Sequence, residues 1–217
     1  MNNFILWFVK ITGWPIQSIY FRKKIYFINK EKQGRYIDGG ALIVSNHISV
    51  YDFPLMMYVF YKNKIRTLIA KTTADKNILF TKFLKWIGGI IVDRTSYDFA
   101  FMSEMIESIN RGDVGLIFPE ARVERVEGES EKGMLPFKPS FVYIALEAGV
   151  PIVPVYTNGI YGKKKKKEKS RTKVIIGEKI YLNEMLDKSK SKKENIDYLC
   201  NYVQEYIKYL GEKIDEK

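Results

Sequence analysis

The sequence predicts an α/β fold: a single domain with a mostly parallel central sheet flanked by helices. Short apolar runs alternate along the chain with longer segments of mixed polarity, and this alternation is typical of βαβ units. The 217 residues suffice for one substantial core and are few for two ordinary domains. We therefore expect an apolar, helical amino-terminal segment over residues 1–28 and a single domain over residues 29–217.

The amino-terminal segment is rich in aromatic and aliphatic side chains as far as the basic residues 22–24. A signal peptide has its positive charges before the apolar run, and a transmembrane helix needs about twenty mostly apolar residues. Lys10 and the break at residues 13–15 interrupt the run, so we expect two short helical segments at one leaflet of a membrane. The alternative is a helical hairpin that packs on the protein's own core.

The remaining elements follow from residue 41 onward. Short apolar runs favour buried strands, and segments with apolar residues three or four positions apart favour helices. The two kinds of segment alternate, as parallel strands with crossover helices require. Strands are expected at residues 41–45, 67–70, 90–93, 114–118, 151–156 and 173–176, and helices at residues 52–61, 77–86, 97–110, 139–148 and 193–213.

His47 is the only histidine, and it follows the first expected strand. A histidine can take and return a proton near neutral pH, and a nearby carboxylate such as that of Asp52 can fix its tautomer. Residues five positions apart do not share a helix face, so these two meet only if a turn or a helix start lies between them. Taken alone, a histidine after a strand more often caps a helix or bonds a buried amide.

Other chemically useful residues also follow strands. Arg94 comes after the third strand and Glu120 after the fourth. The carboxyl ends of parallel strands meet at one edge of a sheet, where α/β proteins place their chemistry. We therefore expect both residues to converge with His47 at that edge.

Residues 46–52 have the pattern Asn-His-x-x-x-x-Asp. It is followed by Gly-Gly-Ile-Ile-Val-Asp-Arg at 88–94, Phe-Pro-Glu-Ala-Arg at 118–122 and Val-Pro-Ile-Val-Pro-Val at 150–155. In the same order, these segments resemble the four motifs of the glycerolipid acyltransferases, the family of 1-acylglycerol-3-phosphate acyltransferases. The resemblance extends over about residues 38–180 and implies an O-acyltransferase.

Transfer of an acyl group from a thioester to an alcohol requires removal of the hydroxyl proton, and a neutral imidazole suits this task. We expect His47 to act as the base, and Asp52 to orient the ring and stabilise the imidazolium that forms. The chain has no Gly-x-Ser-x-Gly nucleophile elbow. Direct transfer without an acyl-enzyme is therefore the simpler mechanism.

The resemblance also implies residues that bind the substrates. An arginine can form two parallel bonds to a phosphate, which favours it over lysine for an acceptor that carries one. By resemblance, the residues expected at the acceptor's glycerol phosphate are Arg94, Glu120, Arg122 and Lys71. Pro151 and Pro154 flank a strand too apolar for chemistry and are expected to shape the edge or floor of an acyl tunnel.

Two positions depart from the family pattern. Ala121 stands where glycine is commoner, so a left-handed turn at this position would be strained. Pro139 follows Lys138 where the family commonly has a further basic residue, which removes one candidate phosphate contact. A proline in the first turn of a helix is structurally benign.

Lys and Arg exceed Asp and Glu by 11, which indicates anionic partners such as lipid headgroups or phosphorylated substrates. No segment resembles a nucleic-acid-binding motif, so nucleic acid is not an expected partner. The single cysteine, Cys200, lies at helical spacing among apolar residues and reads as a core residue. With one histidine there is little to bind a transition metal, and we expect neither metal nor cofactor.

The sequence thus predicts an enzyme that converts 1-acylglycerol 3-phosphate into phosphatidic acid, with acyl-CoA or acyl carrier protein as the thioester co-substrate. We expect it on the cytoplasmic face of the inner (plasma) membrane, because of the apolar amino-terminal segment and the positive charge. Two alternatives stay open. One is the same chemistry on glycerol 3-phosphate or another lysophospholipid, and the other is a non-catalytic basic module that binds anionic membrane or nucleic acid.

Overall fold

The computed structural model describes residues 1–75, 77–93, 99–123, 134–158 and 171–216. Within these residues, seven strands form one sheet. The strands are β1 (Lys24–Phe27), β2 (Ala41–Ser45), β3 (Ile65–Ala70), β4 (Gly89–Val92), β5 (Val114–Ile117), β6 (Ile152–Asn158) and β7 (Lys173–Ile176). They lie in the order β1-β7-β6-β2-β5-β3-β4, and every neighbouring pair is parallel except β6 and β7. The predicted α/β fold with a mostly parallel sheet is confirmed.

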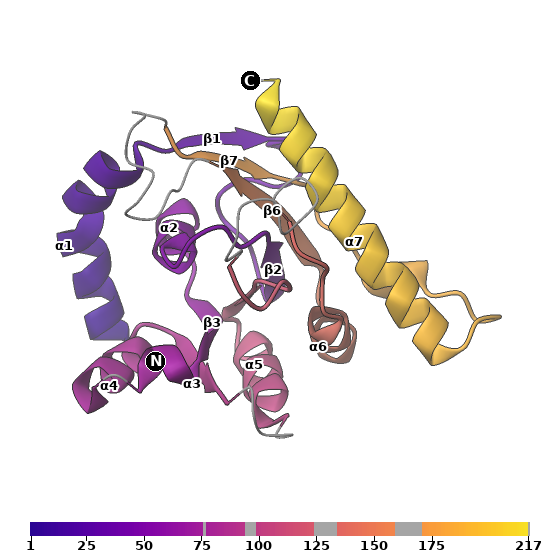
Figure 1. Ribbon diagram of the computed structural model, residues 1–217, viewed down its shortest axis with the longest axis horizontal. Coiled ribbons are helices and arrows are strands. Elements are labelled where there is room, and N and C mark those ends of the chain that lie inside the picture. The colour runs from indigo at the N-terminus through magenta and orange to yellow at the C-terminus, as the bar shows by residue number, and fades with distance from the viewer. Residues whose placement is uncertain (76, 94–98, 124–133, 159–170, 217) are drawn as a thin grey trace.

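Helices flank the sheet on both sides (Figure 1). They are α1 (Asn3–Phe21), α2 (Asp52–Val59), α3 (Lys71–Ala74), α4 (Ile78–Trp86), α5 (Ala100–Asn110), α6 (Ser140–Ala148), α7 (Lys192–Asp215) and the 3-10 helix η2 (Leu182–Met185). Helix α7 begins with a capping box, in which Ser191 and Glu194 satisfy each other's backbone N–H groups. Helix α6 ends at Gly149, which adopts the left-handed conformation that favours glycine.

The central strand β2 shows how the sheet joins two cores. All five of its residues are buried, because successive side chains point to opposite faces and both faces are covered. Leu42 and Val44 pack in one cluster with residues of α5, α6 and α7. Ala41 and Ile43 pack in the other with residues of α2. The two clusters fix the position of β2, at whose end His47 lies.

Helix α1 is continuous from Asn3 to Phe21, so the prediction of two segments separated at residues 13–15 is wrong. Pro15 removes one helical hydrogen bond, but packing on α2 holds the helix in line. The hydroxyl of Tyr58 donates to the carbonyl of Val9 over 2.9 Å, and the buried side chain of Phe21 anchors the other end. None of the helices in the described part of the chain, α1 included, has the length and apolar character needed to cross a membrane.

Strand β1 lies inside the predicted amino-terminal segment and yet belongs to the sheet. It pairs in parallel with β7, with Lys24 opposite Lys173 and Phe27 opposite Ile176. Ile25 and Phe27 pack on the cluster that contains Ile43. The sheet therefore begins before the boundary expected at residue 28.

Candidate active site

Asn46 directly follows β2 and is hydrogen-bonded to the neighbouring strand β6. Its amide Nδ2 donates to the carbonyl of Thr157 over 2.9 Å, and the N–H of Thr157 donates to Oδ1 of Asn46 over 2.8 Å. Both residues are buried, and Thr157 belongs to the neighbouring strand β6. The two bonds extend the contact of β2 with β6 beyond Ser45, the last β2 residue in the ladder. The sheet itself therefore sets the position of the next residue, His47.

His47 and Asp52 form the predicted hydrogen-bonded pair. The distance between Nδ1 of His47 and Oδ2 of Asp52 is 2.7 Å. Asp52 is the first residue of α2, so the start of a helix lies between the two residues, as the spacing requires. The Asp52 side chain is fully buried, whereas 19% of the His47 side chain is exposed. A neutral ring bonded in this way carries its proton on Nδ1 and presents Nε2 as a proton acceptor.

The charge of Asp52 is stabilised by the backbone around it. Its Oδ2 also accepts the N–H groups of Ile48 and Ser49, both over 2.9 Å. Its Oδ1 is buried and accepts no hydrogen bond from the described residues. The first turn of α2 contributes the positive end of the helix dipole at this point. Backbone dipoles therefore stabilise the carboxylate that orients His47.

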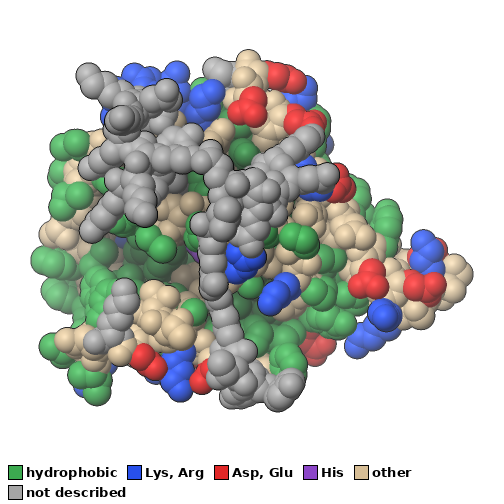
Figure 2. Space-filling view, in the orientation of Figure 1, with side chains coloured by type: hydrophobic (Ala, Val, Ile, Leu, Met, Phe, Trp, Pro, Cys, Tyr) green, Lys and Arg blue, Asp and Glu red, His purple; other side chains and the backbone are tan. Residues whose placement is uncertain are grey.

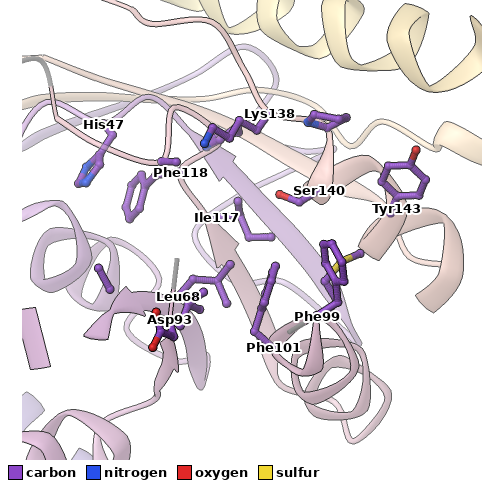
Figure 3. A pocket seen from close by; sticks show the side chains of 16 residues that line it. His47, Leu68, Asp93, Phe99, Phe101, Ile117, Phe118, Lys138, Ser140 and Tyr143 are labelled. Carbon is purple, nitrogen blue, oxygen red and sulfur yellow. The ribbon is translucent and has the colours of Figure 1, made fainter. Parts of the chain in front are cut away.

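A largely apolar pocket of about 450 Å³ opens beside His47. The His47 ring stacks on Phe118, with ring centroids 4.5 Å apart. Figure 3 shows His47, Phe118 and Lys138 toward one end of the pocket, and Phe99 and Tyr143 toward the other. The residues that line the pocket are His47, Leu68, Ala70, Val92, Asp93, Phe99, Phe101, Met102, Ile117, Phe118, Pro119, Ala121, Lys138, Pro139, Ser140 and Tyr143. The volume and lining suit an apolar ligand.

Glu120 converges with His47, as predicted, but its carboxylate binds the backbone. Oε1 accepts the N–H of His47 over 2.7 Å, and Oε2 accepts the N–H of Leu135 over 2.8 Å. The residue is 4% exposed and does not belong to the pocket lining. Glu120 therefore joins the loop after β2 to the segment before α6. The expected contact between Glu120 and the acceptor finds no support in this geometry.

Burial raises the pKa of Glu120 from its ordinary 4.5 to about 7, although the two backbone N–H donors favour the charged form. The carboxyl group with this raised pKa accepts the backbone N–H of His47. A change in the charge of Glu120 would therefore act directly on the hydrogen bond to the His47 backbone.

The other residues expected at the acceptor phosphate have different surroundings. Arg94 lies outside the described residues. Lys71 is exposed at the start of α3, and its Nζ pairs with Oδ2 of Asp93 at 3.0 Å. Asp93 lines the pocket, whereas Lys71 and the half-buried Arg122 do not. Among the described residues, Lys71 therefore contacts the pocket lining through its ion pair with Asp93.

Pro151 and Pro154 lie away from the pocket, in and before β6. The carbonyl of Pro151 accepts the N–H of Leu42 over 3.0 Å, and that of Pro154 accepts the N–H of Gly177 over 2.9 Å. Through their carbonyls, the two prolines join this part of the chain to β2 and to the residue after β7. The pocket gives no support to the expectation that they line an acyl tunnel.

Ala121 has a left-handed conformation, with φ at +61°. This is the conformation expected from the sequence to be strained for alanine. An alanine there is strained by about 1–2 kcal/mol relative to the right-handed region. The carbonyl of Phe118 accepts the N–H of Ala121 over 3.0 Å and closes this turn at the pocket wall. The strain therefore sits in the turn that presents Phe118 and Glu120.

Lys138 is a site residue that the sequence reasoning did not select. It is exposed, it lines the pocket, and the ion pairs found among the described residues do not include it. Its backbone N–H donates to the carbonyl of Pro119 over 3.0 Å, which fixes the start of its side chain at the rim. In the sequence, Lys138 stands directly before Pro139, at the point where the chain departs from the family pattern.

This arrangement defines an α/β enzyme site in which a histidine, oriented by a buried carboxylate, faces an apolar pocket. Such a site suits the deprotonation of an alcohol beside a long apolar group. The model of the family described as Acyltransferase matches residues 24–158, which is more than half of the chain. The chain belongs to the acyltransferase family, and the predicted resemblance is confirmed.

Similar proteins agree with this family. The chain is 28% identical to the 1-acyl-sn-glycerol-3-phosphate acyltransferase of Haemophilus influenzae, over 82% of the chain and 70% of that relative. It is 28% identical to the human 1-acyl-sn-glycerol-3-phosphate acyltransferase beta, over 73% of the chain and only 56% of that relative. The crystal structure of the acyltransferase PlsC from Thermotoga maritima matches 98% of the chain and 80% of its own, with a TM-score of 0.69 and 21% identity. The similarity to this crystal structure supports the α/β fold described above.

Proposed function

We propose that this protein transfers a fatty acyl group from a thioester to the free hydroxyl of 1-acylglycerol 3-phosphate and so forms phosphatidic acid. The observation that carries the proposal is the 2.7 Å bond between His47 and the buried Asp52 at the apolar pocket. The names of the relatives from Haemophilus influenzae and human, which cover most of the chain, support the choice of acceptor.

In the proposed reaction, Nε2 of His47 takes the proton of the acceptor hydroxyl as its oxygen attacks the thioester carbonyl. The new C–O bond forms, the C–S bond breaks, and the imidazolium returns its proton to the departing thiolate. Asp52 stabilises the imidazolium in between. Acyl-CoA and acyl carrier protein both remain candidates for the thioester, and the proposal needs no metal or further cofactor.

Acceptor-dependent release of thiol tests this proposal. The protein is given a long-chain acyl-CoA or acyl carrier protein, with each of four acceptor conditions. These are 1-acylglycerol 3-phosphate, glycerol 3-phosphate, a lysophospholipid without a terminal phosphate, and no acceptor. We expect thiol release and formation of phosphatidic acid with the first. Faster transfer to another acceptor would change the proposed acceptor but not the proposed reaction. If no acceptor led to thiol release, the proposed acyltransferase activity would be contradicted.

The positive charge of Lys138 is proposed to bind the acceptor phosphate. Lys138→Gln should raise KM for 1-acylglycerol 3-phosphate about tenfold or more, because a hydrogen bond to a charged group is lost. The effect on an acceptor without a terminal phosphate should be small. Lys193→Gln, a matched change at an exposed position of α7, serves as the control. Equal KM values for wild type and Lys138→Gln would remove Lys138 from acceptor binding.

We propose that the protein lies at the cytoplasmic face of an inner membrane, with α1 and α4 in the bilayer surface. Large hydrophobic side chains of both helices are exposed, and green side chains gather on the left of Figure 2, the side on which Figure 1 shows these helices. An exposed apolar surface of this kind commonly marks a membrane or partner contact. Its residues are Phe4, Trp7, Phe8, Ile11, Trp14, Ile16, Ile19, Tyr20, Ile78, Leu79, Phe80 and Trp86.

A further inference from the structure

Cations gather at the carboxyl end of α2, the end opposite Asp52. The guanidinium of Arg35 donates to the carbonyl of Val59 over 2.9 Å and to that of Tyr58 over 2.8 Å. Nζ of Lys10 donates to the carbonyls of Tyr61 and Asn63, over 2.8 and 2.7 Å. The bonds of Arg35 satisfy carbonyl groups that the end of α2 leaves free, and those of Lys10 satisfy carbonyls in the turn that follows. The positive charges suit the negative end of the helix dipole.

A third cation, Lys23, lies among aromatic rings beside Arg35. Its Nζ is 5.5 Å from the ring centroid of Trp14 and 6.0 Å from that of Tyr58, and it donates to the side chain of Gln17. The guanidinium carbon of Arg35 is 5.0 Å from the ring centroid of Tyr61. Trp14 meets both tyrosines edge-on, with centroids 6.3 Å apart. We call Trp14, Lys23, Arg35, Tyr58 and Tyr61 the Lys23 cluster.

The Lys23 cluster holds positive charges together without a carboxylate among the described partners. The ion pairs between described residues do not involve Lys10, Lys23 or Arg35. Burial and the nearby charge of Arg35 lower the pKa of Lys23 to about 8, and burial lowers that of Lys10 to about 8. An anion that came between Lys23 and Arg35 would relieve this repulsion.

The cluster is open to solvent and adjoins an apolar surface. Trp14 is 47% exposed and Tyr61 is 41% exposed, and Lys23 and Arg35 are half-buried, so both cations keep some contact with solvent. On the same end of α1, Ile16 and Ile19 are 71% and 78% exposed. An anionic group attached to apolar chains meets both requirements, whereas a soluble anion meets only the first. Tryptophan and tyrosine are also the residues that proteins place at the headgroup level of bilayers.

We propose that Lys23 and Arg35, framed by Trp14 and Tyr61, bind the anionic phosphate headgroup of a bilayer lipid. The site is separate from the His47 pocket and does not depend on the proposed reaction. It lies at the far end of α2 from Asp52, a distance of about 12 Å for a helix of 8 residues. A lipid bound there seats α1 on the membrane without occupying the pocket.

Vesicle binding tests this site with a matched pair of variants. Lys23→Gln and the neighbouring Lys24→Gln remove the same charge at the same end of α1, but Lys24 is exposed and outside the cluster. With vesicles of phosphatidylcholine and phosphatidylglycerol, Lys24→Gln should weaken binding no more than about fivefold, as for any lysine near an anionic surface. Lys23→Gln should weaken it about thirtyfold, because hydrogen bonds to a charged group are lost as well. Lys23→Arg should retain most of the binding.

Three outcomes decide the proposal. Equal losses for the two glutamine variants, with unchanged melting temperatures, would reduce the effect to general attraction and overturn the site. Strong competition by inorganic phosphate, beyond that of chloride at equal ionic strength, would assign the cluster to a soluble anion and overturn the lipid assignment. A larger loss for Lys23→Gln that disappears with vesicles of phosphatidylcholine alone supports the proposal.

Discussion

His47→Ala should lower kcat about a thousandfold while the protein stays folded. The variant removes the only imidazole in the chain, and general-base catalysis typically contributes about a hundredfold to ten-thousandfold. The ring is partly exposed at the pocket, so its loss leaves the sheet and its two cores intact. Acceptor-dependent thiol release measures the activity, and circular dichroism melting measures the fold.

Asp52→Asn should produce a loss of similar size, about a thousandfold to ten-thousandfold. The amide keeps an oxygen for the N–H groups of Ile48 and Ser49, but it loses the negative charge that stabilises the imidazolium. Asp197→Asn, the same substitution at an exposed position of α7, controls for the change of net charge. Near-normal turnover in Asp52→Asn or in His47→Ala would remove the proposed mechanism.

Glu120→Ala should cost both stability and activity. Two backbone N–H groups, the buried one of Leu135 and the part-buried one of His47, lose their acceptor, which costs about 2–4 kcal/mol in the free energy of unfolding. The loop that carries His47 then loses its tie, and a misplacement of about 1 Å can cost about a hundredfold in rate. Chemical unfolding and kcat measure the two effects. An unchanged kcat in a folded Glu120→Ala variant would show that this tie does not position the base.

The titration of Glu120 adds a signature in pH. Its pKa in the folded protein is about 7, against an ordinary value of 4.5. Between these values the unfolded chain has lost the proton that the folded protein retains, so stability falls as the pH rises from about 4.5 through 7. The free energy of unfolding falls by at most about 3 kcal/mol over this pH range. Glu120→Gln should abolish this dependence, whereas the exposed control Glu147→Gln should keep it. An equal slope in Glu120→Gln and wild type would contradict the raised pKa.

The sequence predicted the strands well because each is a short apolar run buried on both faces. The strands at 41–45 and 173–176 have the predicted bounds, and most other elements differ by one to three residues. Strand β1 was missed because its residues follow an apolar helix and were taken as part of it. Helix α3 was missed because a single turn has no periodicity to detect. The continuity of α1 through Pro15 depends on contacts with α2, which local sequence does not contain.

The pairing of His47 with Asp52 was predictable because both residues lie in one short motif. The role of Glu120 was not, since its donors come from residues 73 and 15 positions away. Lys138 could be selected only from the pocket that it lines. This pocket joins the ends of four strands to the starts of α5 and α6. The Lys23 cluster could be recognised only from the packing of α1 on α2. Contacts between distant segments are thus the part that sequence patterns did not provide.

The tautomer of His47 in the free enzyme tests most directly whether Asp52 orients this ring as the base. The chain has one histidine, so nitrogen NMR of the imidazole reports this residue without assignment. In the neutral form we expect a proton on Nδ1, bonded to Asp52, and an unprotonated Nε2 that faces the pocket, with the preference lost in Asp52→Asn. A neutral ring protonated on Nε2, or one unaffected by Asp52→Asn, would contradict the claim that Asp52 poises His47 as the base.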